Sequence, residues 1–82
     1  MTHGLYAVKD VKTTFWTPHT QVNDIAAQRA FANMVNSDDP FMVQNYADVE
    51  YWKLGTFDDV TGITTSEVVF LCSGVDVKKV TQ

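Results

Sequence analysis

Apolar residues concentrate in two adjacent runs in the second half of the chain, at residues 49–57 and 63–72. Both runs are rich in aromatic and β-branched side chains, which is typical of strands. They flank the loop Asp58–Gly62, and a loop that begins with Asp and ends with Gly fits a type I turn closed by a glycine with positive φ. The pattern therefore predicts a β-hairpin over residues 49–64, with a second arm that extends to Cys72.

The second arm carries apolar residues on both of its sides. Val68 and Phe70 alternate with Val69 and Leu71 along this segment. A strand with one solvated face would instead alternate apolar and polar residues. The pattern therefore predicts a strand that is central in its sheet or lies at an interface.

A shorter hairpin is predicted near the start of the chain. Residues 5–11 alternate, so that Leu5 and Ala7 share one face of a strand and Tyr6 and Val8 share the other. A turn over residues 10–13 leads to a predicted second strand over residues 14–17. Pro18 has no N–H to donate, so this strand ends there or lies at a sheet edge.

Between the two hairpins, apolar residues recur with helical spacing and predict one helix over residues 24–35. Asn23 is a good N-cap, and the negative charge of Asp24 is favourable at the positive end of the helix dipole. The residues 36–40, which include two aspartates and a proline, end the helix. The predicted apolar face consists of Ala27, Ala30, Phe31, Met34 and Val35.

The resulting order, β-β-α-β-β, predicts an α+β fold in which a single helix packs on a mostly antiparallel sheet. Residues 41–45 are expected to form a loop with apolar anchors, and residues 45–48 a single helical turn. We expect one domain over residues 1–82, with a mobile tail from about residue 73. The alternative is a small OB-like barrel, which would need a fifth strand from Phe41–Gln44 or Val75–Val80.

Composition narrows the classes of partner. The chain has 82 residues with six Lys and Arg against ten Asp and Glu, a formal net charge of -4. This balance repels phosphate at long range, although a local basic patch can still act within a Debye length of about 8–10 Å. It also argues against binding to an anionic membrane. Because so small a core is thin, we expect a homodimer.

The cysteine count and the absence of long apolar runs suggest where the protein works. Cys72 is the single cysteine, so an intramolecular disulfide is impossible, which fits a reducing cytoplasm. No segment approaches the roughly 18 apolar residues of a membrane span. We therefore expect a soluble intracellular protein.

No arrangement of residues predicts catalysis, a cofactor or a metal. The acidic pairs at residues 38–39 and 58–59 have too few ligands for a calcium loop and fit turns. His3, His19 and Cys72 lack zinc-like spacing. No nucleophilic triad or glycine-rich phosphate loop is present, so we expect a protein that is not an enzyme.

Aromatic and basic residues instead suggest a surface for single-stranded nucleic acid, which stacks its bases on aromatic rings and places its phosphates near cations. Both predicted hairpins combine such residues, and the helix adds one arginine. The competing interpretation is that the large rings form the core and that the arginine is merely solvated. The candidate residues are Lys9, Lys12, Phe15, Trp16, Arg29, Tyr51, Trp52 and Lys53.

Several segments resemble a known family. In order, residues 5–13, 23–24, 29–36 and 54–63 are similar to the small nonstructural protein of gokushovirus-type microviruses. The opening strand and the Gly-x-Phe-Asp-Asp-x-x-Gly hairpin are the most specific parts, and the resemblance covers about residues 5 to 65. The chain departs from the family at Asn45-Tyr46, where the family has Asn-Pro, and its tail after Thr65 shows no resemblance.

The resemblance implies a bacteriophage protein, made in the host bacterial cytoplasm by a virus with a circular single-stranded DNA genome. It further implies a non-enzymatic accessory role in single-stranded DNA synthesis or genome packaging. Net charge favours a different function class, an interaction module that binds a viral or host protein through a strand edge or apolar patch without contacting nucleic acid. Both alternatives stay open at the level of sequence.

Overall fold

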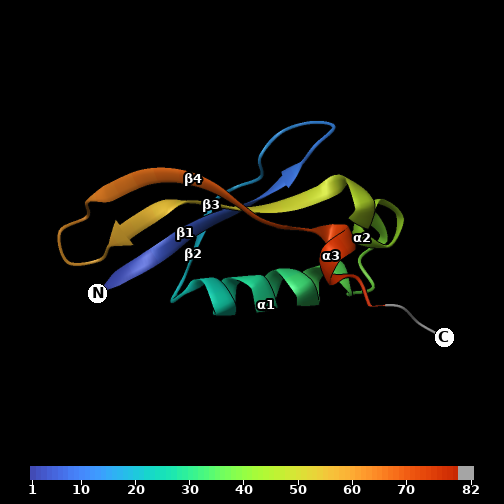
Figure 1. Ribbon diagram of the computed structural model, residues 1–82, viewed down its shortest axis with the longest axis horizontal. Coiled ribbons are helices and arrows are strands. Elements are labelled where there is room, and N and C mark those ends of the chain that lie inside the picture. The colour runs from blue at the N-terminus through green and yellow to red at the C-terminus, as the bar shows by residue number, and fades with distance from the viewer. Residues whose placement is uncertain (80–82) are drawn as a thin grey trace.

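The computed structural model describes residues 1–79 and contains one open, antiparallel, four-stranded sheet (Figure 1). The spatial order is β2-β1-β3-β4, so the two long central strands pair with each other and the other two strands form the edges. In chain order the strands are β1 (Thr2–Asp10), β2 (His19–Gln21), β3 (Val49–Asp58) and β4 (Thr64–Ser73).

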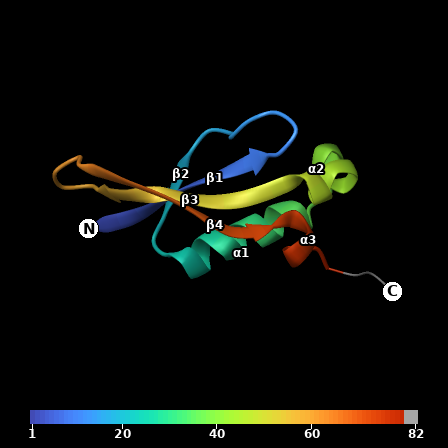
Figure 2. The ribbon, with the colours of Figure 1, turned by 45° about the horizontal axis from the view of Figure 1, so that its top comes forward.

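The helices cover one face of this sheet. Figures 1 and 2 show α1 and α3 against the same face and α2 at one end of the sheet, while the tip of the β3–β4 hairpin projects beyond α1. The opposite face carries Ala7, Trp52 and Phe70, which the strand register places side by side. We call it the open face. The helical elements are α1 (Asp24–Val35), α2 (Pro40–Asn45), η1 (Tyr46–Asp48) and α3 (Gly74–Val77).

Helix α1 begins and ends at the predicted residues. The side chain of Asn23 accepts a hydrogen bond from the N–H of Ala26 at 2.8 Å, which satisfies one of the free donors of the first turn. At the other end, the N–H of Asn36 bonds to the carbonyl of Ala32. The face that is buried against the sheet consists of Ala27, Phe31 and Val35, all members of the predicted apolar face.

The core between α1 and the sheet is built around a stack of aromatic rings. The ring of Tyr51 lies between those of Phe31 and Tyr6, at centroid distances of 4.8 and 5.7 Å. Burial of each such side chain contributes on the order of 1.5–3 kcal/mol. The whole buried cluster consists of Tyr6, Val8, Ala27, Phe31, Val35, Met42, Val49, Tyr51 and Cys72.

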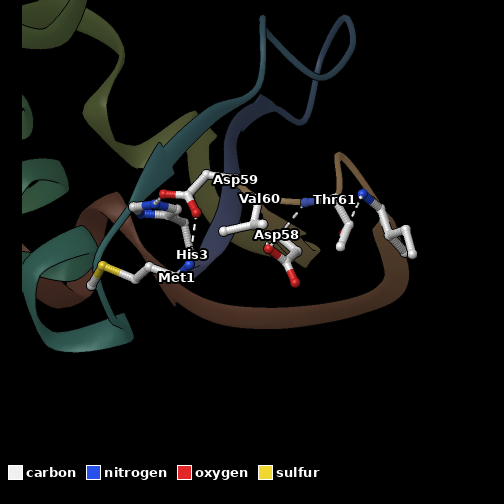
Figure 3. Close-up of polar contacts among 7 residues, drawn as sticks. Met1, His3, Asp58, Asp59, Val60 and Thr61 are labelled. Carbon is white, nitrogen blue, oxygen red and sulfur yellow. Dashed lines mark hydrogen bonds and ion pairs between the residues drawn. The ribbon is translucent and has the colours of Figure 1, made fainter.

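The tip of the β3–β4 hairpin forms the turn predicted for residues 58–62 (Figure 3). The carboxylate of Asp58 accepts a hydrogen bond from the N–H of Val60 at 2.9 Å, and this bond is the main reason that the pKa of Asp58 is lowered. Gly62 has a φ of 77° and donates its N–H to the carbonyl of Asp58 at 2.8 Å. The prediction of a turn closed by a glycine with positive φ is confirmed.

The neighbouring carboxylate of Asp59 ties this tip to the start of β1. It lies 2.6 Å from the amino group of Met1 and 2.8 Å from Nε2 of His3. Figure 3 draws these residues together at the start of β1. The hydrogen bond from the amino group is the main reason that the pKa of Asp59 is lowered. The hairpin tip is therefore held to β1 by side chains as well as by the strand ladder.

The predicted second strand over residues 14–17 is wrong. Phe15 makes only an isolated bridge to Lys9, and the strand that forms is β2, which pairs with Gly4–Tyr6. Pro18 explains the shift, because it cannot donate to a ladder and the chain can pair continuously only after it. The excursion over residues 11–18 consequently lies beside the far end of β1.

The prediction of a single helix is also wrong. Residues 40–45 form α2 rather than a loop, with Pro40 at its first turn, where a proline loses no intrahelical hydrogen bond, and with Met42 fully buried. The single turn expected at residues 45–48 is present as η1. Burial of apolar anchors in a short segment decided the helix, which is too short for a periodic signal.

The end of the described chain is folded. Ser73 and Asp76 form a capping box that begins α3, and the side chain of Asn36 donates to the carbonyl of Val77 at 2.9 Å and accepts from the N–H of Lys79 at 2.8 Å. The polar composition predicted a mobile tail from about residue 73. Residues 74–77 are helical instead, and the rest of that prediction, at residues 80–82, lies outside the described residues.

The barrel alternative is not matched. Phe41–Gln44 lies in α2 and Val75–Val77 in α3, so neither segment supplies a fifth strand to the described sheet. The prediction that the second hairpin arm is central is likewise wrong, because β4 is an edge strand and every residue from Thr64 to Phe70 is exposed. The remaining option, that this strand lies at an interface, stays a prediction.

Candidate functional site

A row of aromatic rings crosses the open face. Trp52 lies in the middle, with its ring centroid 6.0 Å from that of Phe15 and 5.4 Å from that of Phe70. Both contacts are edge-to-face, at interplanar angles of 79° and 71°, so the rings are not stacked on one another. Phe15 and Phe70 are 38% and 45% exposed, and we call these three residues the aromatic row.

Strand register and one bridge bring the aromatic row together. Trp52 pairs directly with Phe70 on β4 and with the fully buried Ala7 on β1, and residues opposite each other in a ladder point to the same face. Phe15 reaches the row because its backbone bridges to Lys9. Three segments that are far apart in the chain therefore contribute one ring each.

A cation lies over two of the rings. Nζ of Lys9 is 5.2 Å from the ring centroid of Phe15 and 5.5 Å from that of Trp52. Such contacts contribute about 0.5–1 kcal/mol at exposed sites. Glu50, the cross-strand partner of Lys9, also holds the indole, because its Oε1 accepts a hydrogen bond from Nε1 of Trp52 at 3.0 Å. The row is thus positioned by side-chain contacts before anything binds to it.

Near the aromatic row, two positive charges are balanced by two negative charges. Lys9 and the exposed Lys12 stand against Glu50 and the buried Asp10, whose carboxylate accepts a hydrogen bond from the N–H of Lys12 at 3.0 Å. The acidic pair at residues 38–39 lies in the loop between α1 and α2, and the pair at residues 58–59 lies at the tip of the β3–β4 hairpin. The net negative charge of the chain is therefore not concentrated on this part of the open face.

Two of the sequence candidates belong to the core. Tyr51 is 1% exposed, its hydroxyl lies 2.6 Å from Nε2 of His19, and burial raises its pKa to about 12. Trp16 packs against the core and meets Phe41 edge-to-face at 5.3 Å. Neither ring lies on the open face, because each is one position away from a ring that does, and neighbouring residues in extended chain point in opposite directions.

Two further candidates lie on the helix-covered side. Nζ of Lys53 is 3.1 Å from the carboxylate of Asp24, and the hydroxyl of Tyr6 donates to the same carboxylate at 2.5 Å. The hydrogen bond from Tyr6 is the main cause of the lowered pKa of Asp24. Arg29 is exposed on α1. Of the eight candidates, the structure therefore brings Lys9, Phe15 and Trp52 together, with Lys12 in the adjoining loop.

Sequence reasoning missed Phe70 and Glu50. The alternation of β4 already grouped Phe70 with Val68, but only the pairing of Trp52 with Phe70 shows which face of the sheet they share. A bulge between Tyr51 and Trp52 shifts that register, and no local signal announces it. Glu50 precedes Trp52 by two residues, so its placement on the same face was a detectable signal.

A groove on the helix-covered side is the main alternative site. It has a volume of about 460 Å³ and lies between the start of α1 and the strands β1 and β3. Its ionisable groups are already paired, since Tyr6 and Lys53 both contact Asp24 and His3 contacts Asp59. The exposed Val22 and Ile25 complete its rim. Among the residues that line it, each ionisable side chain already has a partner, so the aromatic row is the stronger candidate.

Other chemistries find no support in the described part of the chain. Within residues 1–79, no three His, Cys, Asp or Glu side chains gather as metal ligands. Cys72 is buried, which raises the pKa of its thiol. Among the described helices, none has the length and apolar character needed to cross a membrane.

Comparison with known protein families gives a match that spans most of the chain. The family model described as Phage ORF5 protein matches residues 3–77 of the chain. This range contains every strand and helix described in residues 1–79, except the first residue of β1, and the whole aromatic row. No curated protein and no solved structure matches.

Proposed function

The chain belongs to the Phage ORF5 protein family, and from this premise we propose that it is a phage accessory protein that binds single-stranded DNA through the open face of its sheet. The finer assignment is a nonstructural protein of microviruses that acts in DNA synthesis or packaging in the host bacterial cytoplasm. That assignment is supported by the resemblance of segments within residues 5–65.

The aromatic row is the observation that carries the proposal. A base that stacks on an aromatic side chain contributes about 1–3 kcal/mol, largely without regard to its identity. Phe15 and Phe70 expose their rings on either side of Trp52, and the rings do not cover one another face to face. Two or three bases on such a row would supply enough free energy to bind without help from the overall charge.

The charges fit a mode of binding in which stacking dominates. Only Lys9 and Lys12 lie where phosphates would pass, and the whole chain carries a net charge of -4. For single strands, each neutralised phosphate adds about -0.7 to the slope of log K against log salt concentration. Two contacts therefore predict a slope near -1.4, which is about a sevenfold loss between ~50 and ~200 mM salt.

The test is a fluorescence anisotropy titration of a labelled oligonucleotide at low and moderate salt. Binding that weakens about sevenfold over the range of ~50 to ~200 mM supports the proposal. A duplex of the same sequence is the control, because paired bases cannot stack on the rings and should bind more weakly. Absence of binding to the single strand at the lower salt concentration would refute the proposal.

One observation favours a second function, an interaction module for a viral or host protein. Strand β4 is an exposed edge, and extended peptides commonly add to such edges as an extra strand. The acidic balance of the chain is compatible with this function as well. The two functions separate in the titration, because a pure interaction module would leave the oligonucleotide free.

A further inference from the structure

Strand β4 is the long outer edge of the sheet. It has ten residues, whereas β2, at the other edge, has three. Along such an edge, the backbone N–H and C=O groups that point away from the sheet form a template for another strand. Among residues 1–79 no strand occupies this side of β4.

The residues that usually protect an edge are missing from β4, although its ladder with β3 is irregular at two points. It contains no lysine, arginine or proline, and Glu67 is its only charged residue. The next three residues, Val68, Val69 and Phe70, are 58%, 41% and 45% exposed. Phe70, opposite Trp52, faces the open side of the sheet, and Val69, opposite Lys53, faces the helix-covered side, so an added strand would bury apolar side chains on both faces.

We propose that β4 pairs antiparallel with β4 of a second copy of this chain, joining two sheets into one. A two-fold axis perpendicular to the sheet brings identical strands together in antiparallel orientation. The free backbone N–H and C=O groups of each β4 edge can then bond to those of the other. The apolar residues Val68–Phe70 lie near the middle of β4, so in this arrangement they can pair with the same residues of the second copy. This pairing does not depend on DNA binding.

Charge selects the register. Centred on Glu67, the pairing would place the two carboxylates directly opposite each other, which is destabilising. Centred on Ser66 or Val68, it would leave them on a diagonal at about 7–8 Å. Centred on Val69, it separates them by four residues, about 14 Å at ~3.4 Å per residue, which exceeds the Debye length of roughly 8–10 Å.

The register centred on Val69 also matches the apolar side chains. Val69 then lies opposite the partner's Val69 on the helix-covered side, and Val68 lies opposite the partner's Phe70. Pairs of aromatic and β-branched residues across strands contribute about 0.2–1 kcal/mol each beyond alanine. Since Phe70 belongs to the aromatic row, the two rows become parts of one surface, a consequence that rests on the proposed function.

The first test measures molecular mass by sedimentation velocity over a wide range of protein concentration, without DNA. We expect a shift from one chain to two as the concentration rises. Val69→Lys should abolish the shift, because it places two ammonium groups opposite each other. Val60→Lys is the matched control, since Val60 is 82% exposed in the hairpin loop and lies outside the pairing.

A single-chain mass at every concentration would overturn the proposal, as would equal effects of the two lysine variants. Thermal melting of both variants separates loss of pairing from loss of folding. The mass measurement uses no DNA, so its outcome is independent of the anisotropy titration. A chain that stays monomeric but binds the oligonucleotide in the titration would refute only the pairing. A chain that dimerises but does not bind the oligonucleotide would refute only the proposed function.

The second test addresses the register, in a Cys72→Ala background that removes the native thiol. Val69→Cys should form covalent dimers with a short thiol-reactive cross-linker, because the two side chains face each other. Val68→Cys is the comparison, since its thiols would be displaced by two positions. Cross-linking of Val68→Cys in preference to Val69→Cys would overturn the register centred on Val69.

Discussion

Trp52 and Phe70 face each other across β3 and β4, with ring centroids 5.4 Å apart and ring planes at 71°. They lie on the face of the sheet that α1 leaves uncovered. Phe70 is 45% exposed although aromatic side chains are the most favourable ones to bury in a small domain. An exposed pair of this kind suggests a surface that binds rather than one that only folds.

Truncation of Phe70 should weaken DNA binding without unfolding the protein. Phe70→Ala removes one ring, and loss of one stacked base at 1–3 kcal/mol corresponds to about a 5- to 150-fold loss of affinity. The measurement is oligonucleotide anisotropy together with a thermal melt. Ile63→Ala is the control, because Ile63 is 64% exposed in the loop of the same hairpin. Equal affinity for wild type and Phe70→Ala would contradict the placement of the site.

Removal of the two lysines should flatten the salt dependence of binding. In the double variant Lys9→Gln, Lys12→Gln, we expect the slope of log K against log salt to move from about -1.4 towards zero. Arg29→Gln removes the same kind of charge from the exposed surface of α1 and should leave the slope unchanged. A slope that responds to Arg29→Gln instead would place the phosphate path on the helix-covered side.

The contact between Tyr6 and Asp24 should make stability depend on pH. Because the pKa of Asp24 is lowered in the folded state, its carboxylate stabilises the fold at neutral pH, and this contribution is lost as the pH falls through that lowered value. Because the Asp24 side chain is 46% exposed and its interactions are screened by solvent, Asp24→Asn should lower the free energy of unfolding by less than about 1 kcal/mol at neutral pH, and progressively less in acid. The measurement is urea unfolding across the acidic range.

Asp38→Asn is the matched control for this pH dependence, since Asp38 is exposed in the loop between α1 and α2. Its unfolding curve should track that of the wild type at each pH. A constant difference between wild type and Asp24→Asn from neutral pH to strong acid would show that the charge of Asp24 contributes nothing.

The two glycines with positive φ should differ in their tolerance of alanine. Gly55 has a φ of 147°, and a Cβ there would overlap the carbonyl oxygen of Thr65, so Gly55→Ala should destabilise by about 2 kcal/mol or more. A Cβ at Gly62, with a φ of 77°, would meet no atom within 4 Å. Gly62→Ala should lower the free energy of unfolding by only about 1–2 kcal/mol, which is the strain of a left-handed backbone conformation in a residue with a Cβ.

Thermal melting checks both glycine variants, since 1 kcal/mol lowers Tm by roughly 4–8 °C in a domain of this size. Gly55→Ala should show the larger fall. Equal shifts for the two variants would mean that β3 moves away from β4 at Gly55 without cost, contrary to the close approach of the two strands.

Local signals in the sequence determined the elements whose ends they encode. The Asn23 side chain caps α1, and the loop from Asp58 to Gly62 makes the predicted turn, because these bonds join residues that are neighbours in the chain. Short elements were not predictable in this way. The helix α2 forms because Met42 finds a place in the core, and β2 forms after Pro18 because its partners lie on β1.

Only the tertiary structure decided which rings face outward. Trp52 is on the open face and Tyr51 is in the core, although both are large aromatics in one predicted strand. Phe15 and Trp16 divide in the same way. A displacement of one residue in a strand sends a side chain to the opposite face, and the register is set by pairing with distant segments and by bulges. The sequence determined that aromatic and basic residues share these hairpins, and the pairing of strands selected the ones that meet solvent.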